Sequence, residues 1–213
     1  MKLENMKINF LGDSITEGTG ASEHTKCYVS QVAKITGADC RNYGIGGSRI
    51  ARQQKFNPES RQDRDFCMRV EEMDEDADIV AVFGGTNDFG HGDAPFGEFS
   101  DRTVNSFYGA LHILFTSLIE KYPTAKIVVF TPFHRCTENN PNPGTGLTLK
   151  PYVEAIREVA EYYSLPVLDL YKESGIQPNV PIMKFTYMTD GLHPNDAGHR
   201  LLAEKVVAFL KSL

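Results

Sequence analysis

Apolar residues gather in short runs of strand length, and between these runs they recur at every third or fourth position. The run at 79–83 is continuous, which is typical of a strand covered on both faces. The predicted strands are residues 7–11, 40–45, 78–83, 126–130 and 167–170. The helical spacing predicts helices over 27–35, 66–73, 101–119, 152–163 and 201–210. Strand and helix therefore alternate along the chain, which predicts an α/β fold with a central parallel sheet and helices on both faces.

The domain organisation follows from what lies between these elements. The 213 residues contain no internal repeat, low-complexity tract or linker, so we expect residues 1–213 to form a single domain. A loop rich in Pro, Asn and Gly at 137–146 is long for a compact domain, and it indicates a functional rim rather than a boundary.

Composition and charge exclude several classes of partner. The net charge is −6, so nothing favours nucleic acid or an anionic membrane surface. No apolar run approaches the ~18 residues of a membrane span. The first residues contain no apolar signal segment, which predicts a cytoplasmic protein without membrane insertion; a signal removed from the sequence is the alternative. The oligomeric state stays open.

The four cysteines are Cys27, Cys40, Cys67 and Cys136. None forms a C-x-x-C pair, so a zinc site is disfavoured. Two disulfides are one interpretation, and a set of reduced thiols, as in the cytoplasm, is the one we favour.

Polar residues with catalytic potential follow the predicted strands. Ser14 lies in the turn after the first strand, and Asn87 lies after the strand that ends near residue 83. In a parallel sheet these carboxyl ends form the edge where ligands bind. A serine needs a base to become a nucleophile, and His193, three residues after Asp190, offers an imidazole with a carboxylate close by in the chain.

Each of these residues also has a structural interpretation. Ser14 could cap the following helix, Asn87 could close a turn, and Asp190 with His193 could form a surface turn. We interpret Asp13 and Asp88 as residues whose hydrogen bonds fix loops. The glycines at 44–47 lack the G-x-G-x-x-G spacing and have no P-loop lysine, so a nucleotide site is disfavoured.

Four sequence blocks resemble those of the SGNH (GDSL-type) serine hydrolase and esterase family. They are Gly12-Asp13-Ser14, Asn42-x-Gly44-x-x-Gly47, Gly85-Thr86-Asn87-Asp88 and Asp190-x-x-His193. The blocks occur in the family's order and span residues 12–194, nearly the whole chain.

The resemblance implies a flavodoxin-like α/β/α sandwich, with a five-stranded parallel sheet, that acts as an acylesterase without metal or cofactor. Ser14 would be the nucleophile, His193 the base, and Asp190 the residue that orients the imidazole. The backbone N–H groups of Ser14 and Gly47 and the side-chain amide of Asn87 would form the oxyanion hole.

The substrate is inferred from the loops expected at the rim, 48–62, 89–99, 133–148 and 175–189. They combine polar residues with four phenylalanines, Phe89, Phe96, Phe99 and Phe133. This mixture predicts a small-molecule ester with a short acyl group, and family analogy adds acetyl groups on carbohydrate. Phe89 and His134 are the candidate substrate-binding residues. The alternatives are a lysophospholipase or acyl-CoA thioesterase of the same family, and a non-enzymatic carbohydrate-binding protein that kept the fold.

Overall fold

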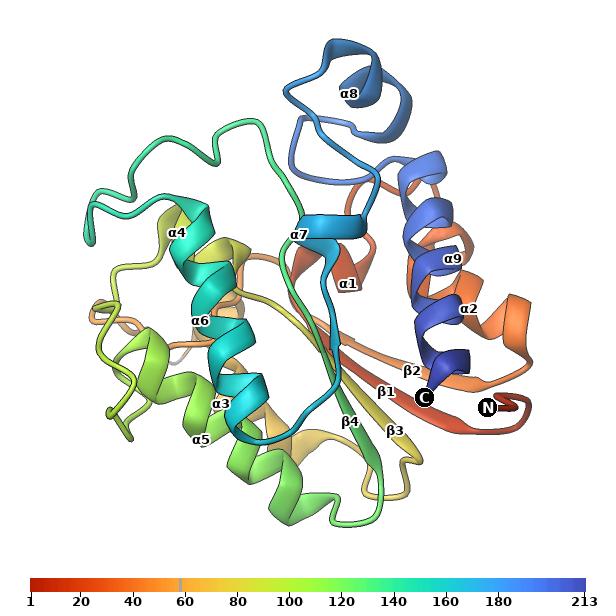
Figure 1. Cartoon of the computed structure of the whole chain (residues 1–213), viewed down its shortest axis with the longest axis horizontal. Helices are drawn as coiled ribbons and strands as arrows, with labels where there is room; N and C mark the ends of the chain where they lie inside the picture. Colours follow the sequence, from red (N-terminus) through yellow and green to blue (C-terminus); the bar gives the residue numbers. More distant parts are fainter. Residues whose placement is uncertain (58) are drawn as a thin grey trace.

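The computed structural model describes residues 1–57 and 59–213, and its centre is a five-stranded sheet in which every pairing is parallel (Figure 1). The strand order is β2-β1-β3-β4-β5, the doubly wound order of flavodoxin-like folds. The strands are β1 Lys7–Gly12, β2 Asp39–Gly44, β3 Ile79–Phe83, β4 Lys126–Phe130 and β5 Val167–Leu168. The predicted fold class and the five-stranded parallel sheet are therefore confirmed.

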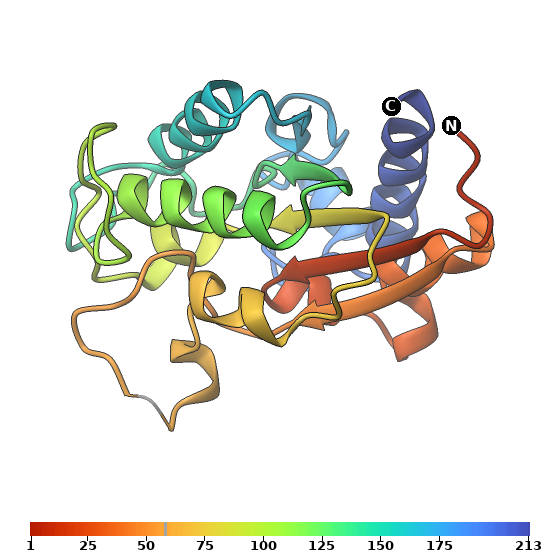
Figure 2. The ribbon, with the colours of Figure 1, turned by 90° about the horizontal axis from the view of Figure 1, so that it is seen from below.

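Helices cover both faces of the sheet, as Figure 2 shows at right angles to the first view. They are α1 Ser14–Glu17, α2 Tyr28–Thr36, α3 Phe66–Arg69, α4 Thr86–His91, α5 Phe107–Lys121, α6 Leu149–Tyr162, α7 Leu170–Glu173, α8 Pro181–Tyr187 and α9 Asp196–Ser212. Helices α3, α5 and α6 pack on one face, and α2 and α9 pack on the other. This gives the three layers that the sequence resemblance implies.

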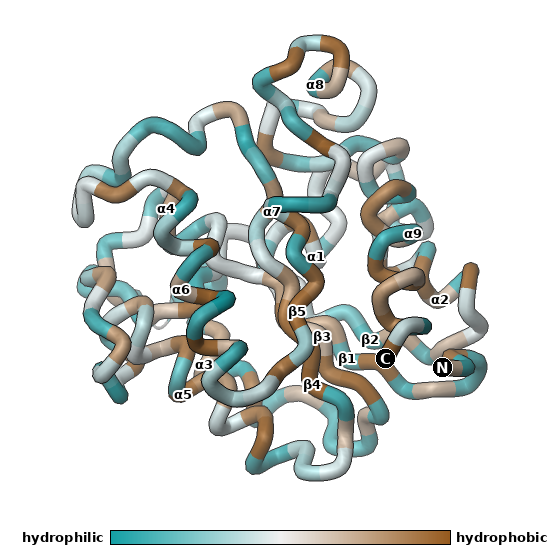
Figure 3. The backbone as a smooth tube through the Cα atoms, in the orientation of Figure 1, coloured by the Kyte–Doolittle hydropathy of each residue, from teal (hydrophilic) through white to brown (hydrophobic). Residues whose placement is uncertain are grey.

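The alternation of side chains along the buried strands builds two separate cores. In β3, Val80 and Val82 pack into the core with α5 and α6, while Ile79, Ala81 and Phe83 pack into the core with α2 and α9. Successive strand residues point to opposite faces, so a strand that is apolar at every position supplies both cores at once. In Figure 3 the strands at the centre of the molecule include brown, hydrophobic segments.

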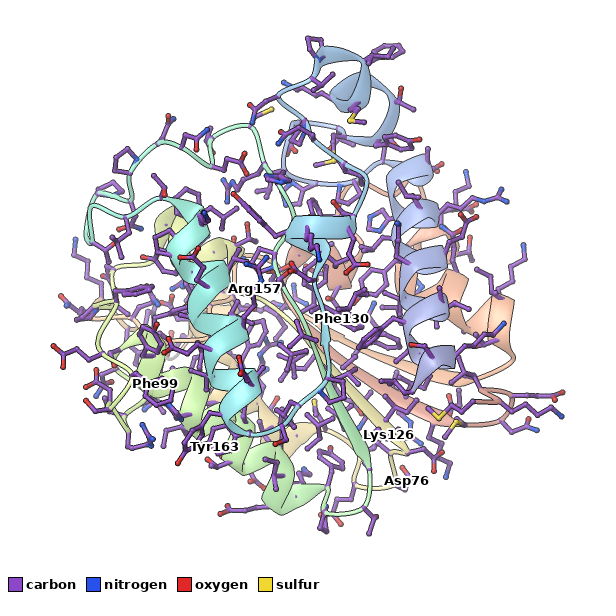
Figure 4. All side chains as sticks on the ribbon, viewed as in Figure 1. Asp76, Phe99, Lys126, Phe130, Arg157 and Tyr163 are labelled. Carbon is purple, nitrogen blue, oxygen red and sulfur yellow. The ribbon has the colours of Figure 1, made fainter. Side chains whose placement is uncertain are left out.

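The amino ends and the carboxyl ends of the parallel strands lie at opposite edges of the sheet. Asp76 and Lys126, labelled in Figure 4, lie at the amino ends of β3 and β4, which are paired in register from Ile79 and Lys126. The carboxyl ends of β1 and β3 lie side by side at the opposite edge. In the strand order these two strands flank the point where the chain reverses its direction of winding, and ligands bind there in open α/β sheets.

Several element boundaries differ from the sequence-based prediction. The long helix α5 starts at Phe107 rather than at Asp101, because Ser106 is its N-cap and accepts a hydrogen bond from the Gly109 N–H. Strand β5 ends at Leu168, because Asp169 already caps α7 through the Lys172 N–H. Helices α4 and α8 lie in segments predicted to be loops.

The four cysteines are free thiols in the structure described here. Over the same residues, no helix combines the length and the apolar character needed to cross a lipid bilayer.

Candidate active site

Ser14 is held at the carboxyl end of β1 by a tight turn into α1. Asp13 is the N-cap of this short helix, and its Oδ1 accepts the Ile15 N–H at 3.0 Å. Gly12 permits the turn, since a Cβ at this position would lie 2.0 Å from Thr16 Oγ1. The Ser14 side chain is thereby fixed at the edge of the sheet, where the residue is only 6% exposed.

Ser14, His193 and Asp190 form a hydrogen-bonded line, although the serine is separated from the other two by most of the chain. Ser14 Oγ lies 3.0 Å from His193 Nε2, and His193 Nδ1 lies 2.7 Å from Asp190 Oδ2. An ionised carboxylate only accepts hydrogen bonds, so Nδ1 carries the proton and Nε2 is left as an acceptor for the serine hydroxyl. The structure thus brings together the three residues that the sequence analysis selected as nucleophile, base and orienting acid.

The loop before α9 keeps Asp190 ionised and aligned. Partial burial raises the pKa of Asp190, but hydrogen bonds from the backbone and ring of His193 and from the Leu192 N–H outweigh this effect and lower it to about 2. Both backbone bonds, at 2.8 Å, end on Oδ1, which leaves Oδ2 for the imidazole. The Asp190 side chain is 54% exposed, so water screens its charge.

The backbone N–H groups of Ser14 and Gly47 are free to act as donors. Within the part of the chain that the structure describes, neither the Ser14 N–H nor the Gly47 N–H has a hydrogen-bond acceptor. The neighbouring Gly46 N–H is occupied by Glu17 Oε2 at 2.7 Å, and the Ser48 N–H by the Ile45 carbonyl. Gly47 is therefore the residue of this loop with a free donor, as the block spacing predicts.

The Gly47 backbone is fixed in a conformation that few other residues adopt. Its φ is +76°, in the left-handed region, which glycine enters without steric cost. Its carbonyl accepts a hydrogen bond from Arg49 Nη1 at 2.9 Å. Arg49 is itself buried and paired with Asp63. This anchoring fixes the direction of the peptide plane.

Asn87 lies on the first turn of α4, directly after β3. Its Nδ2 donates to the Ser48 carbonyl at 3.1 Å, which uses one of the two amide hydrogens and leaves the other. The bond connects α4 to the loop that carries Gly47. The arrangement therefore places the third predicted donor in the same cluster of loops as the other two.

Asp13 and Asp88 fix loops through hydrogen bonds, as predicted. Asp88 accepts the Ile50 and Ala51 N–H groups at 3.0 and 2.9 Å, which ties α4 to the segment after Gly47. Burial raises the pKa of Asp13 to about 7 and that of Asp88 to about 6, although their backbone hydrogen bonds oppose the change. The buried surroundings of both carboxyl groups therefore disfavour their ionised form.

We expect Asp13→Asn to stabilise the protein more at pH 8 than at pH 5. An unfolded chain loses the Asp13 proton near pH 3.8, whereas the folded protein retains it up to about pH 7. The folded state thus binds more protons in this window, so stability falls as the pH rises through it and the loss is complete above pH 7. The amide is never charged, and its oxygen can still accept the Ile15 N–H. The gain at pH 8 should be roughly 1–4 kcal/mol, measured by denaturant unfolding at both pH values.

The exposed Glu120 on α5 provides the control, because Glu120→Gln removes a carboxylate that is not buried. It should leave stability unchanged at both pH values. An equal effect of Asp13→Asn at pH 5 and pH 8 would contradict the explanation by burial.

The phenylalanines predicted at the rim mostly belong to the core. Phe89 is 3% exposed and packs against Tyr152, and Phe133 is buried with the α2 and α9 side of the sheet. Phe96 and Phe99 pack against the core at the amino end of α5. These side chains therefore pack mostly into the core instead of forming an exposed aromatic rim, and they no longer support a short acyl group.

The second candidate substrate-binding residue, His134, contacts Glu138 of its own loop and Tyr171 of α7. Its Nδ1 lies 2.7 Å from Glu138 Oε2, and its ring lies 4.0 Å from that of Tyr171 on α7. Arg157, labelled in Figure 4, extends from α6 to Asp169 in the same region. Contact of His134 or Phe89 with a substrate stays a prediction.

Sequence reasoning missed three buried or half-buried arginines near the site. Arg69 donates to the carbonyls of Tyr43 and Gly12, Arg49 anchors Gly47, and Arg135 donates to Thr86. The number of arginines between Gly47 and Arg69 was a signal in the sequence, but composition alone does not show which of them are buried. Among the described residues no group of His, Cys, Asp and Glu is arranged to hold a metal ion.

The order of the sheet and the Ser–His–Asp line at its edge define a three-layer α/β protein of the SGNH hydrolase fold. The chain belongs to the GDSL-like lipase/acylhydrolase family, whose pattern it matches over residues 10–201.

Solved structures with the same fold include proteins from several bacteria. A protein from Lactobacillus plantarum is 34% identical, with a TM-score of 0.82 over 98% of each chain. A lipase/acylhydrolase from Enterococcus faecalis is 23% identical, with a TM-score of 0.64 over 97% of this chain and 96% of that one. A two-domain esterase active on acetylated mannans is 24% identical, with a TM-score of 0.64 over 98% of this chain and 49% of that one. No curated protein matches the chain significantly.

Proposed function

We propose that this protein is a serine esterase that hydrolyses carboxylic esters through a covalent acyl-enzyme. The observation that carries the proposal is the 3.0 Å contact between Ser14 Oγ and His193 Nε2, with Asp190 bonded to the other ring nitrogen. A serine that merely caps a helix has no need of an imidazole on its hydroxyl. The free N–H groups of Ser14 and Gly47 and the amide of Asn87 support the same chemistry.

The geometry supports a two-step reaction. Ser14 Oγ attacks the acyl carbon while its proton passes to His193 Nε2, and the carbonyl oxygen becomes an oxyanion. The donors of Ser14, Gly47 and Asn87 stabilise this charge. The C–O bond to the alcohol then breaks, and the alkoxide leaves with the proton from His193. A water molecule, deprotonated by the same imidazole, attacks the acyl-enzyme, and the acid is released with Ser14 restored.

The acyl group is proposed to be short, with acetyl groups on carbohydrate as the candidate substrate. Support comes from the structural similarity to an esterase active on acetylated mannans. At 24% identity that similarity concerns the fold, so the substrate rests on analogy. The family is broad enough to include lipid substrates as well.

One observation favours a longer acyl chain, and with it the lysophospholipase or thioesterase alternative. A groove of about 710 Å³ lies between α8 and the loop after β4, and Met188 and Thr189 in its wall directly precede Asp190. Phe185, which is 84% exposed, and Pro181 add apolar surface to the groove. The groove has room for a chain of many carbon atoms, although neither Ser14 nor His193 is among the residues that line it.

Labelling and substrate length test these alternatives. A fluorophosphonate should label the wild-type protein and fail to label Ser14→Ala; a folded wild-type protein that is not labelled would favour a binding protein without catalysis. Activity on 4-nitrophenyl esters should be highest for acetate and fall towards longer chains, and acetylated sugars should release acetate. Activity that rises with chain length would instead favour the lipid substrates.

A further inference from the structure

Arg135 lies between the two halves of the candidate site. It follows β4 on the loop at the carboxyl edge of the sheet, and its Nη1 donates to the carbonyl and the hydroxyl of Thr86 at 3.1 and 3.2 Å. Thr86 immediately precedes Asn87. The guanidinium also lies over the ring of Phe89, 5.4 Å from its centroid. Its position is therefore fixed on the side of the predicted oxyanion donors.

The other half of the site acts on Arg135 electrostatically. Burial lowers the pKa of Arg135, and the carboxylates of Asp13 and Asp190 act against this change. An arginine stays protonated in proteins even under such conditions. Arg135 thus supplies a permanent positive charge close to the Ser14 turn and the Asp190–His193 loop, in a chain whose net charge is −6.

The guanidinium of Arg135 retains a terminal nitrogen that the protein does not use. No carboxylate of the described residues lies within 4.0 Å of it, and its Nη2 makes no hydrogen bond there while remaining accessible to solvent. Its Nε is buried without a partner among the described residues, and the same holds for the Nε of Arg49 and Arg69. These two arginines differ from Arg135 in their terminal nitrogens. Arg49 bonds Gly47 and Asp63 with its two terminal nitrogens, and Arg69 bonds Tyr43, Gly12 and Ser48.

We propose that Arg135 binds an anionic oxygen group of the substrate, a carboxylate or a phosphate, close to the ester that is hydrolysed. The proposal rests on the esterase function proposed above and narrows its substrate class to esters that carry a negative charge. Arginine offers planar donors that match the oxygens of both groups. If Arg135 served only to hold Thr86 in place, the hydrogen bonds of Nη1 to Thr86 would be sufficient. Arg49 and Arg69 use both of their terminal nitrogens, whereas the Nη2 of Arg135 is left for a ligand.

Pairs of esters in which only one member carries an anionic group provide the test. The 4-nitrophenyl monoester of glutaric acid is compared with 4-nitrophenyl valerate, which places the charge on the acyl group. On the alcohol side, 4-acetoxybenzoate and 4-acetoxyphenyl phosphate are each compared with methyl 4-acetoxybenzoate, and these two anions distinguish a carboxylate from a phosphate. For each pair kcat/KM is measured for the wild type, Arg135→Gln, Arg135→Lys and Arg200→Gln. Arg200 is an exposed arginine on α9 and serves as the matched control for the loss of one positive charge.

We expect the wild type to prefer the charged member of at least one pair by about tenfold to a hundredfold, which is the range of a charge-assisted hydrogen bond. Arg135→Gln should lower the charged-to-neutral ratio of kcat/KM to about one, mainly by raising KM for the charged ester; Arg135→Lys should retain part of the preference, and Arg200→Gln all of it. A wild type without charge preference in every pair would overturn the proposal, as would an Arg135→Gln variant that slows both members of a pair equally.

A measurement on the wild type alone keeps the proposal testable if Arg135→Gln folds poorly. Inorganic phosphate or glutarate should slow fluorophosphonate labelling of Ser14 at a concentration where chloride of equal ionic strength does not. Labelling that neither anion slows would count against an anion site. Failure of the esterase function gives a different result, namely no labelling and no hydrolysis of any ester.

Discussion

Ser14→Ala is expected to lower kcat for ester hydrolysis by a factor of about 10⁴–10⁶ while the protein remains fully folded, as found when a serine protease loses its nucleophile. The substitution removes a single oxygen atom, the one that lies 3.0 Å from His193 Nε2. The turn itself does not depend on that hydroxyl, because Asp13 caps α1 and the Glu17 N–H bonds the Asp13 carbonyl. Residual activity should come from the oxyanion donors acting on a water molecule. Steady-state kinetics on 4-nitrophenyl acetate, together with thermal unfolding, measures both parts of the prediction.

Ser100→Ala supplies the control, since Ser100 is exposed in a loop before α5. It should retain both activity and stability. A Ser14→Ala protein that keeps more than about a tenth of wild-type kcat would show that the reaction has another nucleophile, whatever the geometry of the hydrogen bonds.

The central parallel sheet could be predicted from the sequence because its inner strands are buried on both faces, whereas the flavodoxin-like arrangement was implied by the family resemblance alone. A continuous apolar run such as Ile79–Phe83 is compatible with few other environments, and its residues supply both cores. The helices with long apolar stripes, α5 and α9, were located for the same reason. These features depend on periodicity, which a single sequence displays directly.

The helices that were not predicted from the sequence are short ones, which contacts with other parts of the chain hold in place. Helix α4 has six residues and contains Gly90, and what holds it in place are contacts such as the hydrogen bonds of Asp88 to Ile50 and Ala51. Helix α8 has no buried residue, and its apolar Ile182 and Phe185 are exposed rather than packed against the core. Short segments of this kind form through tertiary contacts rather than through intrinsic propensity, and local patterns do not reveal those contacts.

The residues of the candidate site also fall into two groups: those that the sequence reveals and those that only the structure reveals. Ser14, Asn87, Asp190 and His193 are recognisable because each is a chemically distinctive residue next to a strand end or a helix start. The choice of Gly47 among three nearby glycines followed from block spacing alone, and the structure supports it through the occupied N–H groups of the neighbours. The role of Arg135 was hidden, because only the folded chain shows that one of its terminal nitrogens is unused.

His193→Gln is expected to cost nearly as much as Ser14→Ala, about 10⁴–10⁶ in kcat, and the double variant should be hardly worse than either single one. The amide of glutamine cannot accept the serine proton and return it to the leaving alcohol, so Ser14 loses its activation even where its position is kept. The two residues act as one unit through a single hydrogen bond, so the two losses do not add. His24→Gln, at an exposed position, should behave as wild type. If the losses of Ser14→Ala and His193→Gln multiply in the double variant, the serine and the histidine act in separate steps, and His193 does not take the serine proton.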